Sequence, residues 1–284
     1  MSAWHARLDD AQRRWASARL PGAQLVRDMS WDLFESIVLH IRTDDGDVVV
    51  KAGGAANHHI DREIAAHPGY TDSLSDTGVA AKLIDSDSVL RIMLLEYLPG
   101  VLVEGTEAEY LPETYARAGA LLRRLHSSAS RQDADHERRA TARALSWLDG
   151  PHRIDSRLAS AARRALEAAP DACVTVVPTH GDWQPRNWLI DDGTIRVIDF
   201  GRFAFRTPST DLTRLAGQQW RGRPELESAF FDAYGPDPRE SEPERWLLDR
   251  IREAVGTACW AFQVGDESFE AHGHRMLTEL LTSQ

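Results

Sequence analysis

The pattern of hydrophobic and polar positions changes along the chain, from short β-branched runs near the N-terminus to helical spacing further on. Residues 37–41 and 48–50 are two such runs, and the polar segment between them contains Asp45-Gly46. An Asp-Gly pair between two apolar runs predicts a β-hairpin, which we expect to end at Lys51. The same reasoning predicts other elements in this part of the chain: a first helix at the N-terminus, a helix over 58–67 that carries Glu63, and strands near 80–84 and 90–97.

The pair Pro99-Gly100 marks the change to mainly helical spacing, and we place a boundary between two lobes there. Residues 1–98 then form a small lobe with a β-sheet and one helix, and residues 99–284 form a larger, mainly helical lobe. The predicted fold class is therefore α+β.

The larger lobe contains a helix whose start is predicted by a capping-box pattern at Thr106 and Glu109 and which ends near His126. A second hairpin is expected at 187–190 and 194–198, across an Asp-Asp-Gly turn. The remaining elements are a polar connector over 131–139, helices near 140–148 and 155–168, an apolar run over 173–177, and three or four helices after residue 211, one of them over 246–262.

Composition and charge narrow the classes of function. The 284 residues include 44 acidic and 33 basic side chains, for a net charge of −11. This charge does not favour nucleic acid or an anionic membrane surface, but it suits a cationic small molecule. Two cysteines are too few for a disulfide framework, and no apolar stretch resembles a signal or a membrane span, so we expect a cytoplasmic protein. No sequence feature predicts an obligate protein partner.

Polar residues at the two ends of the second hairpin give the most specific chemical signal. Asp182 and Asn187 precede its first strand and Asp199 follows its second. Because these ends lie side by side in an antiparallel hairpin, the three oxygen-bearing side chains should converge. Phosphoryl transfer needs a carboxylate that orients the attacking hydroxyl and accepts its proton, and further oxygen ligands that hold Mg²⁺ on the nucleotide phosphates. Asp182 suits the first role, and Asn187 and Asp199 suit the second.

These motifs resemble those of a known superfamily. His180-Gly-Asp182 with Asn187 five residues after the aspartate, followed by Ile-Asp-Phe-Gly at 198–201, resembles the HxD-x4-N and DFG elements of kinases. The HGD form followed by Trp-Gln-Pro is similar to the aminoglycoside phosphotransferase and choline kinase-like family, over most of the chain. The resemblance implies a bilobal protein-kinase-like fold that binds ATP, with GTP as the alternative, and Mg²⁺ between its lobes.

The resemblance also implies roles for residues outside the hairpin. Lys51 corresponds to the lysine that neutralises nucleotide phosphates, and Glu63 to its ion-pair partner. The backbone near Glu96 and Leu98 would contact the adenine, and Asp211 would support the catalytic loop. We interpret His180, like His126, as structural. No GxGxxG sequence lies between residues 25 and 39, so Ser30 and Ser36 are the candidate phosphate contacts in that loop.

Residues that follow the motif or lie near the C-terminus are candidates for binding the acceptor. Aromatic faces and carboxylates suit a polyhydroxylated amine. The candidates are Trp183, Trp260, Asp266, Glu267 and Glu270. An equally good interpretation is that the tryptophans belong to the core and the acids to a solvated helix face.

The leading hypothesis is an ATP-dependent O-phosphotransferase that acts on a hydroxyl of a small cationic molecule such as an aminoglycoside-like antibiotic. A metabolic kinase for an amino sugar or amino alcohol is an alternative. A kinase of protein Ser or Thr is disfavoured because no APE-like segment follows the DFG element. A non-catalytic nucleotide-binding module is disfavoured because Lys51, Asp182 and Asp199 are all present.

Overall fold

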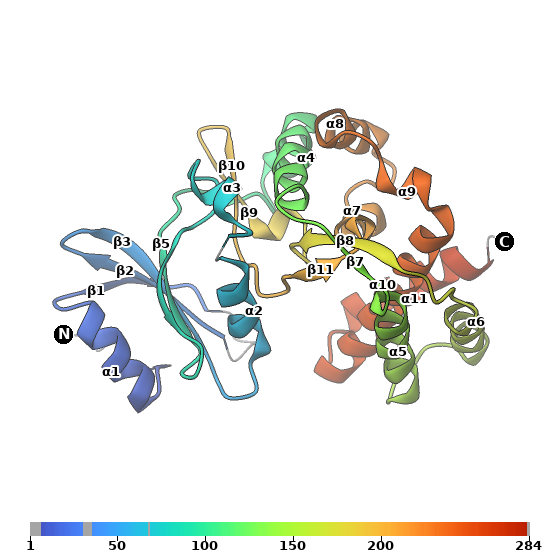
Figure 1. Cartoon of the computed structure of the whole chain (residues 1–284), viewed down its shortest axis with the longest axis horizontal. Coiled ribbons are helices and arrows are strands. Elements are labelled where there is room, and N and C mark those ends of the chain that lie inside the picture. Colours follow the sequence, from blue (N-terminus) through green and yellow to red (C-terminus); the bar gives the residue numbers. More distant parts are fainter. Residues whose placement is uncertain (1–6, 31–35, 68, 283–284) are drawn as a thin grey trace.

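The structure is a computed structural model and describes residues 7–30, 36–67 and 69–282. Its N-terminal part is built on a five-stranded antiparallel sheet and its C-terminal part mainly on helices (Figure 1). The sheet has the strand order β1-β2-β3-β5-β4. Its strands are β1 (Gln24–Asp28), β2 (Ser36–Thr43), β3 (Gly46–Gly53), β4 (Leu83–Asp87) and β5 (Ile92–Glu96).

The predicted first hairpin is confirmed as β2 and β3, which pair from Ser36 with Gly53 to Thr43 with Gly46. β3 is longer than expected, so Lys51 lies within the strand rather than at its end. Strand residues alternate between faces, and Val50 and Ala52 pack in a cluster with α1 (Asp10–Arg19). Lys51 therefore points to the opposite face, which α2 covers.

The helix that carries Glu63 is confirmed as α2 (His58–Ala66). The side chain of Asn57 caps it by accepting a hydrogen bond from the His59 amide at 2.9 Å. Ile60 of α2 packs against Met93 and Leu95 of β5. These contacts fix the distance between α2 and the central strands of the sheet.

The segment between α2 and β4 differs from the expected strand near 80–84. A short helix, α3 (Asp72–Ser75), occupies part of it, and β4 begins only at Leu83. Ala80 instead forms an isolated parallel bridge with Val197 in the second hairpin. Leu74 and Ala80 accordingly belong to the hydrophobic core of the C-terminal part.

The capping-box prediction at Thr106 and Glu109 is wrong. The Thr106 hydroxyl donates to the Val103 carbonyl, and the Glu109 carboxylate accepts from the Gly105 amide. This segment forms a 3₁₀ turn, η2 (Glu107–Tyr110), and α4 (Pro112–His126) begins after it. A proline at the first helical position explains the later start, because its missing N–H would have no intrahelical partner there.

The second hairpin is confirmed as β9 (Trp188–Asp191) and β10 (Thr194–Val197), and β6 (Val101–Leu102) adds a third strand to it. A further sheet of order β11-β8-β7 was only partly predicted. β8 (Val174–Thr179) extends the apolar run. β7 (Arg131–Asp133) lies in the supposed connector, and β11 (Ala204–Arg206) follows the DFG segment.

Helices enclose these small sheets. α4 packs closely on α8 (Pro224–Tyr234), and α10 (Pro243–Val264) packs on α11 (Glu267–Thr282). After residue 211 the described chain holds five helices rather than three or four, because α7 and α9 are short. The other elements of this part are α5 (His136–Asp149), α6 (Ser156–Glu167), η3 (Pro185–Asn187), η4 (Pro208–Leu212), α7 (Thr213–Gly217) and α9 (Pro238–Ser241).

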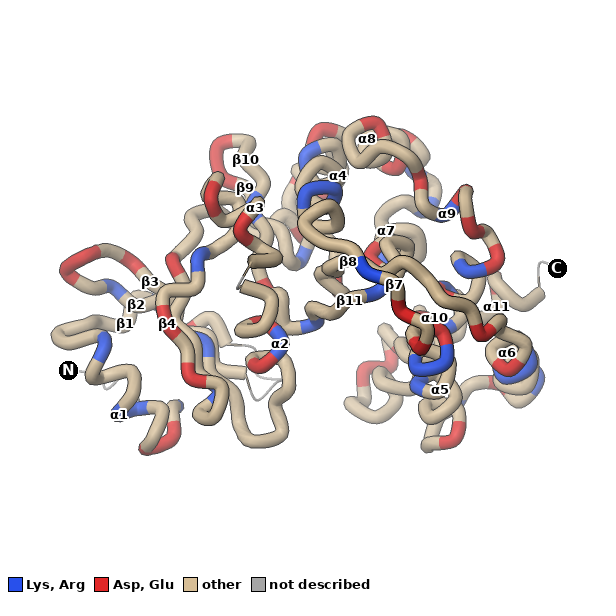
Figure 2. Tube along the Cα trace, in the orientation of Figure 1, with Lys and Arg blue, Asp and Glu red and all other residues tan. Residues whose placement is uncertain are grey.

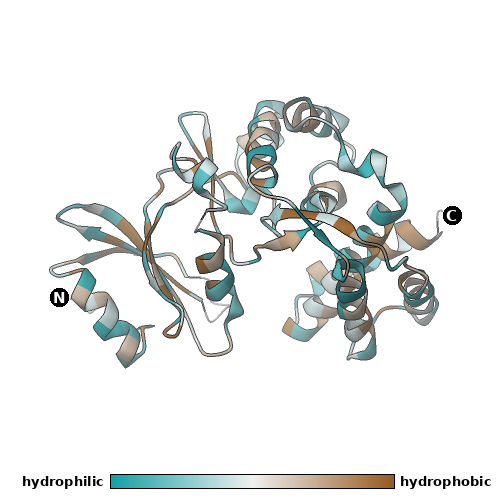
Figure 3. Cartoon of the chain, in the orientation of Figure 1, coloured by the Kyte–Doolittle hydropathy of each residue, from teal (hydrophilic) through white to brown (hydrophobic). Residues whose placement is uncertain are grey.

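Hydrophobic and charged positions differ in how they are distributed over the elements. Hydrophobic positions concentrate on β5 and β8 (Figure 3). Acidic and basic positions alternate along much of the chain, in both parts of the molecule (Figure 2). Among the described residues, no helix is both long and apolar enough to cross a membrane.

Candidate active site

The two ends of the second hairpin meet beside the N-terminal sheet. Asp182 lies between β8 and η3, and Asp199 lies just after β10. The ammonium group of Lys51 reaches across from β3 to within 3.3 Å of Asp199 Oδ1. The structure thus brings both motif segments and the β3 lysine to one place.

Lys51 lies between two carboxylates. Its Nζ donates to Glu63 Oε2 at 2.5 Å, and Asp199 is its second partner. Burial by itself would lower the pKa of Lys51, but the charges of Asp199 and Glu63 raise it above its usual value. Because α2 fixes Glu63 and β3 fixes Lys51, the ammonium group is held extended toward Asp199.

Asp199 has an unusual backbone conformation and an accessible carboxylate. Its φ of 65° is in the left-handed region, which aspartate tolerates better than most residues. The neighbouring Gly201 carbonyl lies 3.0 Å from His59 Nδ1 of α2, which ties this turn to the N-terminal part. The Asp199 side chain is 52% exposed although Lys51 pairs with it, and the Lys51 charge lowers its pKa. An ionised, accessible carboxylate is what a metal–phosphate complex requires.

Asp182 lies between two guanidinium groups. Arg214 Nη1 is 2.7 Å from Oδ1, and Arg186 Nη2 donates to Oδ2 at 2.6 Å. Gln184 Nε2 also donates to Oδ1, at 2.5 Å. Burial works to raise the pKa of Asp182, but the charges of Arg214 and Arg186 outweigh burial and hold the pKa well below its usual range.

These contacts leave room for one more hydrogen bond to Asp182. A carboxylate offers about four lone-pair directions, two on each oxygen. Arg214 and Gln184 take those of Oδ1, while Arg186 takes one on Oδ2. The remaining direction on Oδ2 can accept a hydrogen bond from a hydroxyl group.

The backbone around Asp182 is fixed by Asp211. The amides of His180 and Gly181 donate to the two oxygens of Asp211, at 2.8 and 2.6 Å. His126 Nε2 lies 3.1 Å from Asp211 Oδ2, and its Nδ1 lies 2.9 Å from the Tyr234 hydroxyl. Asp211 is only 2% exposed, so it serves the loop and not a ligand.

His180 is also engaged within the protein. Its Nδ1 accepts the Asp182 amide at 3.2 Å, which leaves Nε2 to carry the proton and donate to the Ile198 carbonyl at 3.0 Å. The imidazole therefore connects the two motif segments. Gly181, between His180 and Asp182, has a φ of +80°. A Cβ atom there would lie 2.4 Å from the Arg202 carbonyl oxygen, so only glycine fits.

Asn187 and Asp199 offer oxygen ligands of the kind that Mg²⁺ prefers. The amide nitrogen of Asn187 donates to the Asp182 carbonyl at 2.8 Å, so its amide oxygen is the atom that would face a metal ion. Across residues 7–30, 36–67 and 69–282, no three His, Cys, Asp or Glu side chains gather into a metal site of their own. These two residues therefore fit a Mg²⁺ ion whose other ligands are phosphate oxygens and water.

The candidate phosphate contacts in the β1–β2 loop have partners within the protein. Residues 31–35 lie outside the described residues. The Ser30 hydroxyl accepts the Val38 amide at 3.0 Å, and the Ser36 hydroxyl accepts from the Asn57 side chain at 2.8 Å. Both hydroxyl groups thus hold the loop against neighbouring elements.

The predicted adenine contacts lie at the end of β5. The amide of Glu96 donates to the Lys82 carbonyl at 3.0 Å, so it is used within the sheet. Leu98 follows β5 and is partly exposed. A backbone contact to a base is therefore expected nearer Leu98 than at the Glu96 amide.

The candidate acceptor residues do not gather at Asp182. Trp183 is completely buried and packs edge-on against Trp188, which corrects its proposed role as an aromatic face for a ligand. Trp260 packs edge-on against Phe269. Trp183 therefore fits the alternative interpretation, in which the tryptophans belong to the hydrophobic core.

The three acidic candidates lie at the start of α11. Asp266 accepts the Phe269 amide at 3.0 Å and so caps the helix. Glu270 is buried and pairs with Arg153 at 2.5 Å. The Glu267 side chain is 84% exposed. Asp266 and Glu270 thus already bind groups of the protein, and a cationic ligand would have to displace those groups.

Sequence reasoning missed the basic residues around Asp182. Arg186 lies inside the quoted motif, four residues after Asp182, and Arg214 follows Asp211 by three residues. The position of Arg186 on the loop could have been recognised as close to the aspartate. Nothing in the sequence places Arg214 there, because its contact depends on how α7 packs.

Comparisons with known proteins agree with this geometry. Residues 34–245 match the model of a phosphotransferase enzyme family. No curated protein matches the chain significantly. Solved structures share its fold at low sequence identity.

Several of these structures cover nearly the whole chain. A thermostable mutant of the aminoglycoside phosphotransferase APH(4)-Ia has a TM-score of 0.70 and 16% identity, over 95% of this chain and 98% of that one. Choline kinase LicA from Streptococcus pneumoniae has a TM-score of 0.66 and 16% identity, over 96% and 98%. Macrolide 2'-phosphotransferase MphH from Brachybacterium faecium has a TM-score of 0.60 and 20% identity, over 94% and 98%. A second structure of the APH(4)-Ia mutant is a ternary complex with ADP and hygromycin B, with a TM-score of 0.66 and 15% identity, over 95% and 97%.

Proposed function

Because the chain belongs to the phosphotransferase enzyme family, we propose that it transfers the γ-phosphate of ATP or GTP to a hydroxyl group of a small molecule. The observation that carries the proposal is a pair of charge groups at the motif segments. One has a cation between two carboxylates, and the other has a carboxylate between two cations. Lys51 pairs with Asp199, and Asp182 pairs with Arg214. We also propose that the nucleotide binds between residues 1–98 and residues 99–284.

On the nucleotide side, Lys51 would neutralise phosphate charge and Glu63 would hold it in place. Asn187 and Asp199 would hold Mg²⁺, which supplies further charge neutralisation on the phosphates. The 2.5 Å contact between Lys51 and Glu63 supports this role for Lys51, because it fixes the ammonium group beside the accessible Asp199. The ADP complex of the APH(4)-Ia mutant supports the use of a nucleotide.

On the acceptor side, Asp182 would orient the attacking hydroxyl through the open direction on Oδ2. Its lowered pKa keeps it ionised at neutral pH and makes it a weak base. This suits phosphoryl transfer through a loose transition state, in which positioning contributes more than early proton removal. The proton would pass to Asp182 late, as the oxygen–phosphorus bond forms.

The acceptor is a small hydroxylated molecule. The relatives named above include enzymes for antibiotics and a choline kinase, so both resistance and metabolism are candidate roles. Neither Cys173 nor Cys259 is paired in a disulfide, which supports the proposed cytoplasmic location.

The test is nucleotide turnover by the purified protein with Mg²⁺ and ATP or GTP across a panel of aminoglycosides, macrolides, amino sugars, amino alcohols and hydroxy acids. Asp182→Ala serves as the blank. We expect at least one acceptor to raise ADP or GDP release above the blank and to gain the mass of one phosphate. Labelled protein substrates and no small-molecule product would favour a protein kinase. Nucleotide binding without turnover by any acceptor would favour a non-catalytic module.

A further inference from the structure

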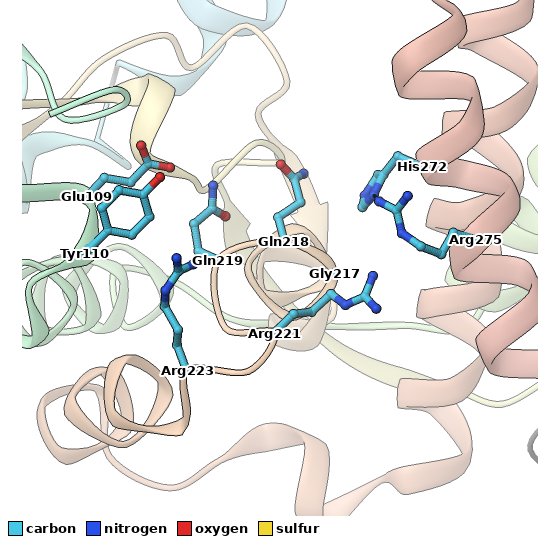
Figure 4. Close-up of a pocket in the computed structure, with 9 residues that line it drawn as sticks. All are labelled: Glu109, Tyr110, Gly217, Gln218, Gln219, Arg221, Arg223, His272 and Arg275. Atoms are coloured by element: carbon cyan, nitrogen blue, oxygen red, sulfur yellow. Dashed lines mark hydrogen bonds between the residues drawn. The ribbon is translucent and has the colours of Figure 1, made fainter. Parts of the chain in front are cut away.

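A cavity of about 340 Å³ opens at the end of α7, and arginines line it (Figure 4). Arg221 and Arg223 come from the loop after α7, and Arg275 comes from α11. Glu109 of η2 is the single acidic residue among the described residues that line it. Three arginines and one acidic residue thus line the cavity.

The arginines differ in how they are paired. Arg221 Nη2 lies 2.5 Å from Glu279 Oε1, and the guanidinium of Arg223 lies 4.5 Å from the centre of the Tyr110 ring. Within the described chain, neither Arg223 nor Arg275 has a carboxylate within 4.0 Å. Arg275 donates to His272 Nδ1 at 2.8 Å. Burial and the neighbouring arginines lower the pKa of His272, so the imidazole stays neutral and leaves the Arg275 charge uncompensated.

The acid of the cavity is already engaged. The Glu109 carboxylate accepts the Gly105 amide at 2.8 Å, and Glu109 is only 8% exposed. It offers little to a ligand. The charge that an incoming molecule meets is therefore mainly that of Arg223 and Arg275.

The cavity adjoins the Asp182 carboxylate through α7. Arg214 near the start of α7 contacts Asp182, and Gly217 at its end lines the cavity. Three residues of helix rise about 4.5 Å. A Cβ atom on Gly217 would lie 3.8 Å from His272 Nε2, so the end of α7 lies directly against the α11 wall. The arginine that contacts Asp182 and a residue that lines the cavity thus lie on the same short helix.

We propose that the cavity binds an anionic group, a carboxylate or a phosphate, of the same acceptor whose hydroxyl meets Asp182. Guanidinium groups recognise both anions through paired N–H donors, and they repel an ammonium group. The inference rests on the proposed function for the identity of the ligand. It reverses the sequence-based expectation of a cationic acceptor, which relied on net charge and on acids that the structure uses elsewhere.

The test measures anion binding without turnover. The protein is saturated with Mg²⁺ and the ATP analogue AMP-PNP, which fills the nucleotide site, and inorganic phosphate is titrated while the arginine Nε–H signals are followed by NMR. We expect saturable binding in the ~millimolar range. Arg275→Gln should weaken it about tenfold, as expected when a charge-assisted hydrogen bond is lost. Arg223→Gln provides a second variant in case the first fails to fold.

Arg164→Gln is the matched control, because Arg164 is an exposed arginine on α6, away from the residues that line the cavity. It should bind phosphate as the wild type does. The proposal is overturned if the wild type shows no saturable binding, or if neither cavity variant weakens it relative to Arg164→Gln. Repeating the titration with acetate distinguishes a carboxylate site from a phosphate site.

The two proposals fail in different ways. Absence of AMP-PNP binding, with phosphate still bound in the cavity, would overturn the proposed function and leave an anion site. Normal AMP-PNP binding and acceptor turnover, with no anion bound in the cavity, would overturn the inference alone. Turnover that prefers D-glucosamine to D-glucuronate would also contradict it.

Discussion

Two charge groups at the motif segments differ in the sign of their central residue. On the nucleotide side, one ammonium group, that of Lys51, lies between the carboxylates of Glu63 and Asp199. On the acceptor side, one carboxylate, that of Asp182, lies between the guanidinium groups of Arg186 and Arg214. In the first group the carboxylates outnumber the ammonium group. In the second, Arg214 also pairs with Glu253 at 3.1 Å, so two cations meet two carboxylates.

The difference indicates what each side can receive. An excess carboxylate that is accessible, as Asp199 is, suits a metal ion that carries phosphates. The cations around Asp182 are all paired with carboxylates, whereas the cavity lined by Arg223 and Arg275 suits an anion. The net charge of −11 did not predict this preference for an anion, because a total charge says nothing of how the charges are placed.

The strongest way to break this comparison is to remove one carboxylate from each group. Asp182→Ala should lower kcat by ~10³-fold or more, because an oriented carboxylate contributes on that scale, and should leave nucleotide affinity nearly unchanged. Asp199→Ala should instead abolish the Mg²⁺-dependent thermal stabilisation by nucleotide. Differential scanning fluorimetry and steady-state kinetics on both variants check this. If both variants lost nucleotide binding equally, the two groups would not be separate.

Arg186→Gln tests the acceptor side alone. Removing one of its two cations should raise the pKa of Asp182, so the acid limb of the kcat/KM profile should move to higher pH. We expect kcat to fall about tenfold at neutral pH, because a charged hydrogen bond that orients Asp182 is lost. The pH profiles of wild type and variant check this. An unchanged acid limb would mean that another group controls it.

Glu63→Gln tests the nucleotide side alone. The uncharged amide should hold Lys51 less firmly, and the KM for ATP should rise several-fold. Asp199 would still pair with Lys51, so the loss should be smaller than that of Asp199→Ala. The KM for the acceptor should stay constant, and a change in it would argue against separate roles for the two groups.

We expect the smallest effect on activity from a change at His67, whose pKa depends in part on the charge of Lys51. Burial and the Lys51 charge lower the pKa of His67 to about 4, from an ordinary 6.5. The unfolded chain therefore takes up a proton on this residue below pH 6.5, while the native chain does so only near pH 4. Its contribution to stability is complete above pH 6.5 and is lost as the pH falls toward 4.

The pKa difference of about 2.5 corresponds to ~3 kcal/mol over that range. Urea unfolding of wild type and His67→Leu at pH 7, 6 and 5 checks this. The difference between their unfolding free energies should decrease toward low pH. A constant difference would show that native His67 titrates normally.

The sequence predicted the parts of this architecture that depend on local chemistry. The two hairpins follow from Asp-Gly turns between apolar runs, and α2 follows from its isoleucine spacing. The convergence of Asp182 and Asp199 follows from hairpin geometry. The fold class and the family likewise followed from motifs that fit within short segments.

What the sequence could not predict depends on contacts between distant segments. Arg214 reaches Asp182 only because η4, which packs beside β8, positions the α7 helix that follows it. Trp183 looks available next to Asp182, but tertiary packing buries it against Trp188. Glu270 meets Arg153 over 117 positions of sequence, which no local pattern shows.

Asp211 also affects the hydrogen exchange of the loop that carries Asp182. The amides of His180 and Gly181 donate to a carboxylate that is buried beside α4 and α8, with His126 and Tyr234 behind it. These amides can exchange their hydrogens with solvent only when Asp211 releases them. We therefore expect the loop that carries Asp182 to be protected from exchange together with the helices that bury Asp211.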